Sequence, residues 1–442
     1  MRIVMLAPFG IHPKGTVLSR TLPLGYALAK KGNEVVLVIP QEEDVSITTN
    51  VSRGSLRLLN VPTGPRGYAI DDLVVSYEMM RKTSSLEPEI IHVFKPKGYG
   101  GLAGMLKWAG DILRNEKKPL VLDGDDHEGF GGMNDVIPYP VAWKLFFHFQ
   151  ERLLPRICDR MTLASTYLMD YYSSFGAERE NMIHLPNGVN PFIHFPGNID
   201  EGLEEFVSKR HMGMEELKGM KNEGSNAFTN GNIKDQVPEE TISLFSRFRD
   251  HGTERVLKIF RAVQNLDRRA KFLLAGDWAG NETVRLRKGM KKYLKEGSFQ
   301  FTGTFPFTSM QEVFSHSNIA MVPVDDSNIT RAKCSAKLVD LMAMGKAVVA
   351  DNIGENGNYI EDGVTGCLVD NIVGAGIPEK DDHHIRDNEK ENLKEFSERL
   401  IYLLDNPMEA NELGREARKR VNSEFSWRKL ARGVADLYHQ LV

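Results

Sequence analysis

Short apolar runs rich in β-branched residues alternate with helical segments from the start of this chain. Residues 2–7 and 34–39 have the length and composition of buried strands, and residues 18–31 between them have the pattern of a helix ending at Gly32. The alternation continues with expected helices at 70–82, 102–115 and 142–157 and expected strands at 90–94, 120–123 and 161–164. Because parallel strands need crossover helices that cover both faces of a sheet, this order predicts a doubly wound, mostly parallel sheet.

The same alternation resumes later in the chain, with expected strands at 242–245, 271–275, 299–301, 319–322 and 347–350. With 442 residues, the chain is too long for one core at roughly 100 to 200 residues per domain. We therefore predict an α/β protein with two doubly wound, Rossmann-like domains. Their expected extents are residues 1–196 and 241–420, with a polar insertion at 197–240 and final helices at 421–442.

Charge and cysteine content exclude several classes of protein. The 56 basic and 60 acidic residues give a net charge of -4, which argues against a nucleic-acid binder because such domains are usually basic. The 3 cysteines form no CxxC pair, which fits a reducing compartment and no structural zinc. The N-terminal apolar run is too short for a signal peptide, and no stretch is apolar enough to span a membrane. We expect a cytoplasmic protein.

The turn after the first expected strand is a candidate ligand loop. Residues 8–16 (PFGIHPKGT) lack the GxGxxG pattern of a dinucleotide site, which makes a nicotinamide enzyme improbable. Backbone N–H groups around Gly15 and Thr16 can still face a polar ligand where the loop enters a helix, with His12 nearby. A glycine that merely makes a turn is the equally open alternative.

Charged side chains gather where two later strands are expected to end. Lys95 and Lys97 follow the strand at 90–94 and can hold an anion at the carboxyl edge of the sheet. The next strand leads into a run of four carboxylates and one imidazole: Asp123, Asp125, Asp126, His127 and Glu128. Such a group can orient sugar hydroxyls, bind a divalent metal or supply a base, and its spacing does not choose among these or exclude a solvated loop.

The second half carries a comparable set of groups. Arg247 follows the expected strand at 242–245, where its planar fork suits a phosphate; a surface salt bridge is the alternative. Ser335 is a good N-cap and Gly345 a good C′ residue for a short helix between them. We expect Lys333, Lys337 and Asp340 to share the polar face of that helix. Lysines at a helix N-terminus suit a diphosphate, and the carboxylate suits ribose hydroxyls; an exposed Lys–Asp pair is the alternative.

Taken in order, several segments resemble the retaining GT-B glycosyltransferases of the family 4 type. The segments are the Gly15 loop, Leu185-Pro-Asn187-Gly188, Ser246-Arg247-Phe248, Asp340-Leu-Met-Ala-Met-Gly345, Gly363-Val-Thr-Gly366 and Phe425-Ser-Trp427. The resemblance implies two Rossmann-like domains facing a cleft: an acceptor domain first, a nucleotide-sugar donor domain second, and final helices that cross back to the first. It also implies transfer of a hexosyl-type sugar from a UDP- or GDP-sugar to an acceptor hydroxyl, with retention of configuration and without a metal or other cofactor.

The resemblance distributes roles among the candidates. For the donor it implies Gly15, Thr16, Arg247, Lys333, Ser335, Lys337, Asp340 and Glu355, and for the acceptor side we add His12, Lys95, Lys97, Asp125 and His127. Catalytic roles are expected for Asp126, Glu128, Asp326 and Lys337.

Two departures from the family pattern concern the donor site. Of the two acids that the family places eight positions apart, the second falls on Asp340, but the first falls on Ala332, and Asp325, Asp326 or Glu355 would have to reach the sugar instead. The lysine expected five residues after Arg247 is Gly252, which leaves Lys337, Lys333 or Arg255 to replace it.

The sequence leaves open the identity of the acceptor and two alternative functions. A saccharide, a lipid-linked molecule or a small molecule can be the acceptor, and the helices at 142–157 and 102–118 are candidate surfaces for peripheral contact with the inner face of a membrane. Because apolar residues run all round the 142–157 helix, we favour its burial in the core. The missing acid at Ala332 motivates an alternative, a sugar-nucleotide or carbohydrate binding protein without catalysis. A sugar-nucleotide epimerase is the third hypothesis.

Overall fold

The computed structural model describes residues 1–11, 15–42, 46–51, 53–63, 69–115, 117–195, 197, 199–200, 202–205, 207, 241–246, 253–276, 281–303, 305, 309–370 and 382–442. His12, Arg247, Gly252 and most of the 197–240 insertion lie outside these residues. The chain divides into two compact units. Unit 1 comprises Met1–Val207, Arg331–Cys334 and Phe425–Val442, and unit 2 comprises Ser208–Thr330 and Ser335–Glu424.

The sheet of unit 1 has the order β3-β4-β2-β1-β5-β6-β7-β8. Its strands are β1 (Arg2–Leu6), β2 (Glu34–Pro40), β3 (Ile47–Val51), β4 (Gly54–Val61), β5 (Ile90–Phe94), β6 (Leu120–Gly124), β7 (Arg160–Leu163) and β8 (Met182–His184). Only the β3–β4 pair is antiparallel among these described strands. The predicted parallel sheet is confirmed, and β3, β4 and β8 are additions that the sequence analysis missed.

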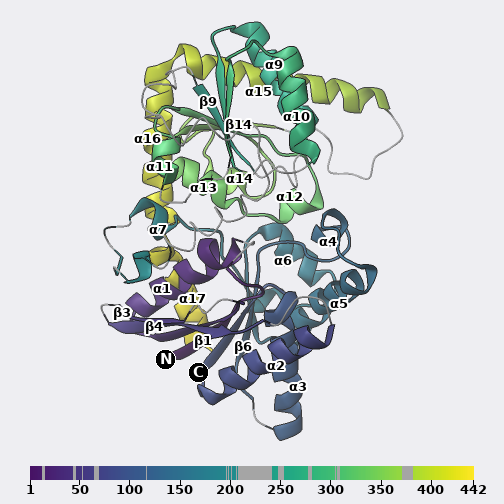
Figure 1. The fold of residues 1–442 in the computed structure, drawn as a ribbon, viewed down its shortest axis with the longest axis vertical. Helices are drawn as coiled ribbons and strands as arrows, with labels where there is room; N and C mark the ends of the chain where they lie inside the picture. The colour runs from purple at the N-terminus through teal and green to yellow at the C-terminus, as the bar shows by residue number, and fades with distance from the viewer. Residues whose placement is uncertain are drawn as a thin grey trace. The chain divides into compact units, whose positions relative to one another are not determined.

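Helices cover both faces of this sheet because the side chains of each buried strand alternate. In β1, Ile3 and Met5 pack in one core with α1 (Leu22–Lys30) and α17 (Trp427–His439). Val4 and Leu6 face a second core on the opposite side of the sheet. The helices there include α2 (Ala69–Ser85), α3 (Gly98–Arg114), α5 (Val141–Ile157) and α6 (Thr166–Ser173), as Figure 1 shows. Shorter helical segments of unit 1 are a π-helical turn (Val17–Thr21), α4 (Met133–Val136), a 3-10 turn (Arg179–Asn181) and α7 (Pro191–His194).

The final helix, α17, is an integral part of unit 1. Trp427, Val434 and Tyr438 are buried in the same core as β1 and α1. The phenol oxygen of Tyr438 also lies 2.6 Å from Nδ1 of His92 on β5. The last residues of the chain therefore complete the first sheet domain.

Unit 2 contains a six-stranded parallel sheet with the order β11-β10-β9-β12-β13-β14. Its strands are β9 (Thr241–Phe245), β10 (Lys271–Ala275), β11 (Phe299–Gly303), β12 (Ile319–Val322), β13 (Ala347–Asp351) and β14 (Cys367–Val369). The described helices are α9 (Thr253–Leu266), α10 (Asn281–Tyr293), α11 (Met310–Val313), α12 (Asn328–Ala332), α13 (Ala336–Ala343), α14 (Asn356–Tyr359), α15 (Asp382–Asp405) and α16 (Pro407–Glu424). The strands predicted for this half are confirmed.

A glycine lets α16 approach the turn after α13. A Cβ atom on Gly414 would lie 2.0 Å from the carbonyl oxygen of Gly345, so a larger residue at position 414 would force the helix away. Gly345 itself has φ +75°, the left-handed conformation expected of a residue that ends a helix. The predicted helix between Ser335 and Gly345 is confirmed.

The predicted burial of the helix at 142–157 is wrong for one side of α5. Phe147 and Leu154 are buried, but Val141, Leu145 and Phe149 are more than half exposed. The helix has apolar residues all round because one side packs in the core and the other side is apolar but exposed. Among the described residues, no helix is long and apolar enough to cross a membrane.

Candidate functional site

The strand order of each unit marks where a ligand would bind. In unit 1 the order reverses at β1, between β2 and β5, and in unit 2 it reverses at β9, between β10 and β12. Open α/β sheets bind ligands outside the carboxyl ends of the strands at such a point. The Gly15 loop follows β1 and Lys95 follows β5, while Asp325 and Asp326 follow β12. The predicted residues therefore come from the appropriate edge of each sheet.

A buried Arg–Asp pair lies beneath this edge in unit 1. Arg20, on the π-helical turn, donates from Nε and Nη2 to the two carboxylate oxygens of Asp123 at 2.7 Å each. Arg20 also donates to Oδ1 of Asn187 at 3.0 Å, and Asp123 accepts from the hydroxyl of Thr162 at 2.6 Å. Because both charged groups are fully buried and hydrogen-bonded, Asp123 anchors the start of the acidic loop and is not open to solvent.

Lys95 gathers the predicted carboxylates around its ammonium group. Its Nζ lies 2.7 Å from Asp125 Oδ1 and 2.9 Å from Glu128 Oε1, and it also pairs with Asp126. Lys97 is fully buried and pairs with the other Glu128 oxygen at 2.7 Å. The two lysines expected to hold an anion are thus neutralised by carboxylates of their own chain, and a lysine occupies the place where a cation would bind the three acids.

The backbone of Lys95 has a left-handed conformation. Its φ of +64° is unfavourable for a residue with a side chain, and its N–H donates to the carbonyl of Asp123 at 2.8 Å. Burial alone would lower the pKa of Lys95, but the three carboxylates around its ammonium group raise it well above its usual value. Burial would likewise raise the pKa of Glu128, but Lys95 and Lys97 hold it below the usual range.

Two other acids near this cluster have raised pKa values. Burial raises the pKa of Asp125 to about 7, an effect that Asp126 strengthens and Lys95 opposes. Burial also raises the pKa of Glu151 to about 7, although its oxygens accept hydrogen bonds from the backbone N–H groups of Glu128 and Gly129 at 2.7 Å each. Glu151 therefore holds the acidic loop in place, and both groups can change protonation near neutral pH.

His127 lies on the same loop and is buried. Its ring centre is 4.1 Å from that of Tyr171, and burial lowers its pKa, so the imidazole is neutral at neutral pH. Asp126 is half-buried beside it. A neutral imidazole next to a carboxylate suits hydrogen bonds to hydroxyl groups.

The segment Arg331–Cys334 belongs to unit 1 although its neighbours in sequence belong to unit 2. Ala332 is fully buried there, and its carbonyl accepts a hydrogen bond from Ser165 Oγ at 2.8 Å. The side chain of Asn187 donates to the carbonyl of Cys334 at 2.7 Å. The position where the family pattern has its first acid is therefore a packed alanine.

The expectation that Lys333 shares a helix face with Lys337 and Asp340 is wrong. Lys333 precedes α13 and lies in the Arg331–Cys334 segment of unit 1. Burial lowers its pKa, with Asp126 opposing that shift and Lys95 adding to it. Lys333 is therefore close enough to the charges around Lys95 to interact with them electrostatically.

Three further predicted donor residues, Ser335, Lys337 and Asp340, lie on unit 2. Ser335 caps α13 by accepting the N–H of Leu338 at 3.2 Å, as predicted. Lys337 is half-buried, with its ammonium 5.4 Å from the centre of the Phe245 ring at the end of β9. Asp340 is 5% exposed on the next turn of the helix. Lys337 therefore reaches the carboxyl end of the strand at which the sheet order reverses.

The predicted residues Asp326 and Glu355 follow the strands β12 and β13. Asp326 is half-buried, whereas Glu355 is 2% exposed and accepts a hydrogen bond from Asn358 at 2.7 Å. In unit 1, the carbonyl of Gly15 accepts from the backbone N–H and hydroxyl of Ser19, and Thr16 precedes the π-helical turn. All four residues lie in segments that follow strands.

Arg255, considered as a substitute phosphate ligand, is engaged within unit 2. Its two terminal nitrogens donate to the Asp351 carboxylate at 2.6 and 2.5 Å, and also to the Val324 carbonyl and the Asn392 side chain. Asp351 is fully buried at the end of β13. Arg255 therefore stabilises the sheet edge and is not available to a diphosphate.

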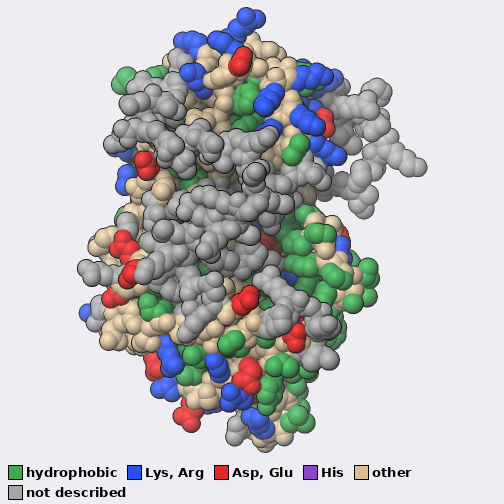
Figure 2. Space-filling view, viewed as in Figure 1, with side chains coloured by type: hydrophobic (Ala, Val, Ile, Leu, Met, Phe, Trp, Pro, Cys, Tyr) green, Lys and Arg blue, Asp and Glu red, His purple; other side chains and the backbone are tan. Residues whose placement is uncertain are grey.

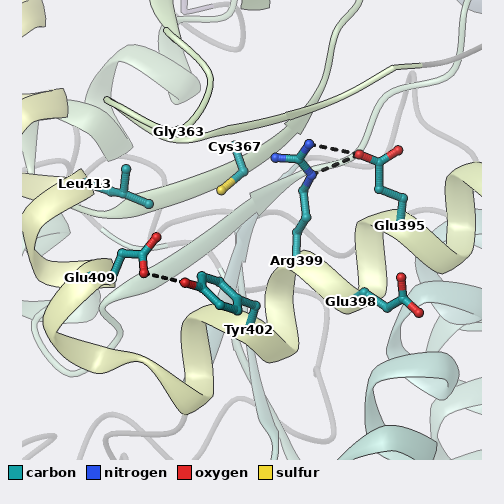
Figure 3. A pocket seen from close by; sticks show the side chains of 8 residues that line it. All are labelled: Gly363, Cys367, Glu395, Glu398, Arg399, Tyr402, Glu409 and Leu413. Atoms are coloured by element: carbon teal, nitrogen blue, oxygen red, sulfur yellow. Dashed lines mark hydrogen bonds and ion pairs between the residues drawn. The ribbon is translucent and has the colours of Figure 1, made fainter.

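An open pocket of about 390 Å³ lies elsewhere on unit 2 (Figure 3). Its polar side chains bind one another: Arg399 pairs with Glu395 at 2.9 Å, and the phenol of Tyr402 donates to Glu409 at 2.6 Å. Cys367 at its wall is the first residue of β14, so this pocket lies at the amino end of that strand. It contains none of the predicted site residues.

The sequence analysis missed three residues that support the site: Arg20, Glu151 and Asn187. Each is buried, and each acts through a partner distant in sequence, such as Asp123 for Arg20. A charged residue within an apolar helical segment was the available signal for Arg20 and Glu151, because buried charges need partners.

Comparison with known proteins identifies the family of a segment that lies mostly in unit 2. Residues 239–379 match the family model of group 1 glycosyl transferases. This segment is a group 1 glycosyltransferase domain. It contains α13 with Lys337 and Asp340, together with Glu355. A curated relative, an uncharacterized glycosyltransferase of Methanocaldococcus jannaschii, is 24% identical over 191 residues, which are 43% of this chain and 42% of that protein.

Solved structures share the fold over the whole length of this chain. Sucrose-phosphate synthase from Thermosynechococcus elongatus superposes with a TM-score of 0.64 at 17% identity, covering 100% of this chain and 99% of that one. The Anabaena protein HepE in complex with UDP and glucose gives a TM-score of 0.61 at 13% identity, covering 100% of both chains. The fold is therefore GT-B, as expected from the sequence.

Proposed function

We propose that the protein transfers a hexosyl-type sugar from a nucleotide-sugar donor to an acceptor hydroxyl, with retention of anomeric configuration. The observation that carries this proposal is the glycosyltransferase domain at 239–379. Within this domain, Lys337 and the buried Asp340 lie on one short helix, α13. The solved HepE complexes, which contain UDP or UDP-glucose, support a donor of that class.

The donor's diphosphate would be bound by Lys337 and the Ser335 end of α13, with Arg247 as a further ligand. As the bond between the sugar carbon and the phosphate oxygen breaks, negative charge develops on the leaving phosphate, and a fixed ammonium group stabilises it. Asp340 would accept hydrogen bonds from the ribose hydroxyls. Gly15 and Thr16 would contribute backbone groups to the donor, and Asp326 or Glu355 would contact the sugar.

The acceptor would be a saccharide, a lipid-linked molecule or a small molecule bound at the acidic loop of unit 1. Asp126 and His127 would orient its hydroxyl group for attack on the sugar carbon. As the new bond forms, the proton of that hydroxyl would pass to an oxygen of the leaving phosphate, which carries the developing negative charge. Lys95, Lys97, Asp125 and Glu128 would fix the charge and shape of this loop through the ion pairs described above, and Lys333 would add positive charge close to it. His12 would lie on the acceptor side.

The test starts with thermal denaturation in the presence of UDP, GDP and ADP and their sugar conjugates, because a ligand that binds only the folded state raises apparent stability. We expect stabilisation by one nucleotide class and, with that class of donor, product formation on an acceptor panel. Lys337→Ala should abolish the stabilisation. Lys258→Ala, at a half-exposed lysine of α9, is the matched control and should retain it. Stabilisation that survives Lys337→Ala contradicts the donor assignment.

A second function, sugar-nucleotide binding without transfer, is favoured by one observation. The position of the family's first acid is Ala332, which is fully buried and hydrogen-bonded to Ser165 through its carbonyl. Nucleotide-sugar binding without product on any acceptor would support this function. Conversion of the sugar without an acceptor would instead indicate an epimerase.

A further inference from the structure

The surface formed by α4, α5 and the residues around them exposes several apolar side chains. We call Phe130, Val136, Val141, Leu145 and Phe149 the α4–α5 patch; their exposed fractions are 40%, 40%, 72%, 57% and 53%. Hydrophobic side chains gather over this part of unit 1 in Figure 2. Contiguous apolar surface of this kind marks a place where a soluble protein meets a partner or a membrane.

The geometry of α5 aligns the most exposed members of the patch. Val141, Leu145 and Phe149 recur every four residues and therefore lie on one side of the helix. Phe147 and Leu154 on its other side are buried in unit 1. The helix is thus apolar toward both the core and the solvent.

Buried contacts hold the patch in a defined shape. The ammonium of Lys97 lies beneath it, 4.7 Å from the ring centre of Tyr139 and 4.8 Å from that of Phe147, and is paired with Glu128. Asn134 on α4 donates to the carbonyl of Lys144 on α5 at 2.8 Å. The exposed apolar groups therefore stand on a fixed base.

The charged residues of α5 indicate which kind of partner the α4–α5 patch fits. Lys144, Arg152 and Arg156 are half-buried or exposed, whereas the one acidic residue of the helix, Glu151, is fully buried. Asp135 on α4 is also exposed, but the three basic residues of α5 outnumber this one acid. An apolar surface with aromatic groups and an excess of positive charge fits the interface of a bilayer that carries anionic headgroups.

A second apolar group on unit 1 provides a contrast. Leu73, Val74 and Tyr77 on α2 are 54%, 55% and 50% exposed. They are flanked by the acidic residues Asp71 and Asp72, and by Glu78, which is paired with Arg81. Negative charge beside these side chains opposes contact with anionic lipid, although their exposure is similar.

The patch is continuous with the acidic loop. Phe130 directly follows Gly129, whose N–H is bound by Glu151, and the N–H of Phe130 donates to Nδ1 of His148 on α5 at 3.3 Å. We propose that the α4–α5 patch docks unit 1 on a bilayer surface carrying anionic lipid headgroups. Docking there would place the loop with Asp126 and His127 next to the membrane interface, where a lipid-anchored hydroxyl compound is available. Binding to the bilayer does not depend on the proposed transfer reaction.

The test is co-sedimentation of the full chain with vesicles of phosphatidylcholine alone or of phosphatidylcholine mixed with phosphatidylglycerol. The wild-type protein should bind the mixed vesicles and be released by salt, since the basic groups are screened. The variant Val141→Ser/Leu145→Ser/Phe149→Ser should lower the vesicle partition coefficient at least about tenfold. The matched variant Leu73→Ser/Val74→Ser/Tyr77→Ser should bind as the wild type does.

Thermal denaturation of both variants checks that they are folded; because all six side chains are at least half exposed, we expect unchanged midpoints. Absence of wild-type binding to the mixed vesicles overturns the proposal. An equal loss in both triple variants also overturns it. A concentration-dependent dimer that disappears only in the α5 variant, without vesicle binding, would show that the patch is a protein interface instead.

Discussion

In each unit, an arginine binds both carboxylate oxygens of a fully buried aspartate at the carboxyl end of a strand. We call each of these two Arg–Asp pairs a clasp. In unit 1, Arg20 binds Asp123 at the end of β6, and in unit 2, Arg255 binds Asp351 at the end of β13. Arg20 is 1% exposed, whereas the Arg255 side chain is 18% exposed. The comparison shows that a charged residue at a strand end need not bind a ligand. Here the two Arg–Asp pairs stabilise the edge of each sheet.

The surroundings of the two clasps differ. In unit 1, Lys95 and Lys97 are neutralised by the acids of the neighbouring loop. In unit 2, Lys337 is half-buried over the Phe245 ring, at the end of the strand where the sheet order reverses. An added anion would have to displace carboxylates in unit 1. The proposed assignment of the donor's diphosphate to unit 2 rests on the glycosyltransferase domain at 239–379, which contains Lys337.

Breaking the two clasps should produce the largest effects. Arg20→Leu leaves Asp123 as an uncompensated buried charge and should lower the free energy of unfolding by about 3 to 5 kcal/mol. Arg255→Leu should cost less, because Arg255 is nearer to solvent, with its side chain 18% exposed. Urea denaturation followed by circular dichroism measures both.

Arg81→Leu is the control for these variants. Arg81 is 60% exposed and pairs with Glu78, so its loss should change the free energy of unfolding by no more than about 1 kcal/mol. A similar loss in all three variants would mean that the buried clasps contribute no more than a surface pair.

Titration of Glu151 should give the next largest effect. Burial raises the pKa of this carboxyl group from 4.5 to about 7 in the folded chain. The folded state therefore holds the proton more tightly, and the associated stabilisation is complete below the unfolded pKa and is lost as pH rises through about 7. From pH 4.5 to about pH 7.5, we expect the free energy of unfolding of the wild type to fall by about 3 kcal/mol relative to that of Glu151→Gln.

Thermal denaturation of the two proteins across this pH range measures the difference. Glu178→Gln, an exposed position on unit 1, should track the wild type at every pH. Parallel curves for wild type and Glu151→Gln would show that Glu151 does not titrate in this range.

The strands were predictable because buried parallel strands are nearly continuous apolar runs. β5 (IIHVF) and β13 (AVVAD) are buried throughout. β3 and β4 were missed because they form an antiparallel pair at the edge of the sheet, in which buried residues alternate with exposed ones and polar residues are common. β8, with three residues, is too short to give a pattern.

The positions of the candidate site residues were predictable from the sequence, but the contacts between their side chains were not. Strand ends identified Lys95 and the acids after β6, yet nothing in the sequence shows that Lys95 binds residues about 30 positions later. Arg20 reaches Asp123 across 103 positions for the same reason. The membership of Arg331–Cys334 in unit 1 depends on tertiary packing of Ala332, which no local pattern indicates.

Substitution of one acid in each unit should separate the two halves of the proposed site. Asp340→Asn should weaken nucleotide binding about ten- to hundredfold, because the carboxylate that we propose accepts hydrogen bonds from the two ribose hydroxyls is replaced by a weaker acceptor. Asp126→Asn should raise the KM for the acceptor and leave nucleotide affinity unchanged. Calorimetric titration with the nucleotide and initial-rate kinetics distinguish these effects. Equal losses of nucleotide affinity in both variants would contradict the division between donor and acceptor units.

The smallest effects should come from two serine caps with the same geometry. Ser165 accepts the N–H of Leu168 at 3.2 Å, and Ser335 accepts the N–H of Leu338 at 3.2 Å. Ser335→Ala should therefore cost about 1 kcal/mol, the usual value for loss of an N-cap. Ser165 also donates to the carbonyl of Ala332 at 2.8 Å, and Ser165→Ala leaves that buried acceptor without this donor.

We expect Ser165→Ala to be the more destabilising of the two by about 1 kcal/mol in urea denaturation. Replacement by threonine, which keeps a hydroxyl group, should restore most of the loss at both positions. Identical losses for Ser165→Ala and Ser335→Ala would show that the hydrogen bond to Ala332 contributes nothing to stability. A larger loss at Ser165 would instead show that the Arg331–Cys334 segment is bound to unit 1 in solution, with alanine at the position where the family pattern has an acid.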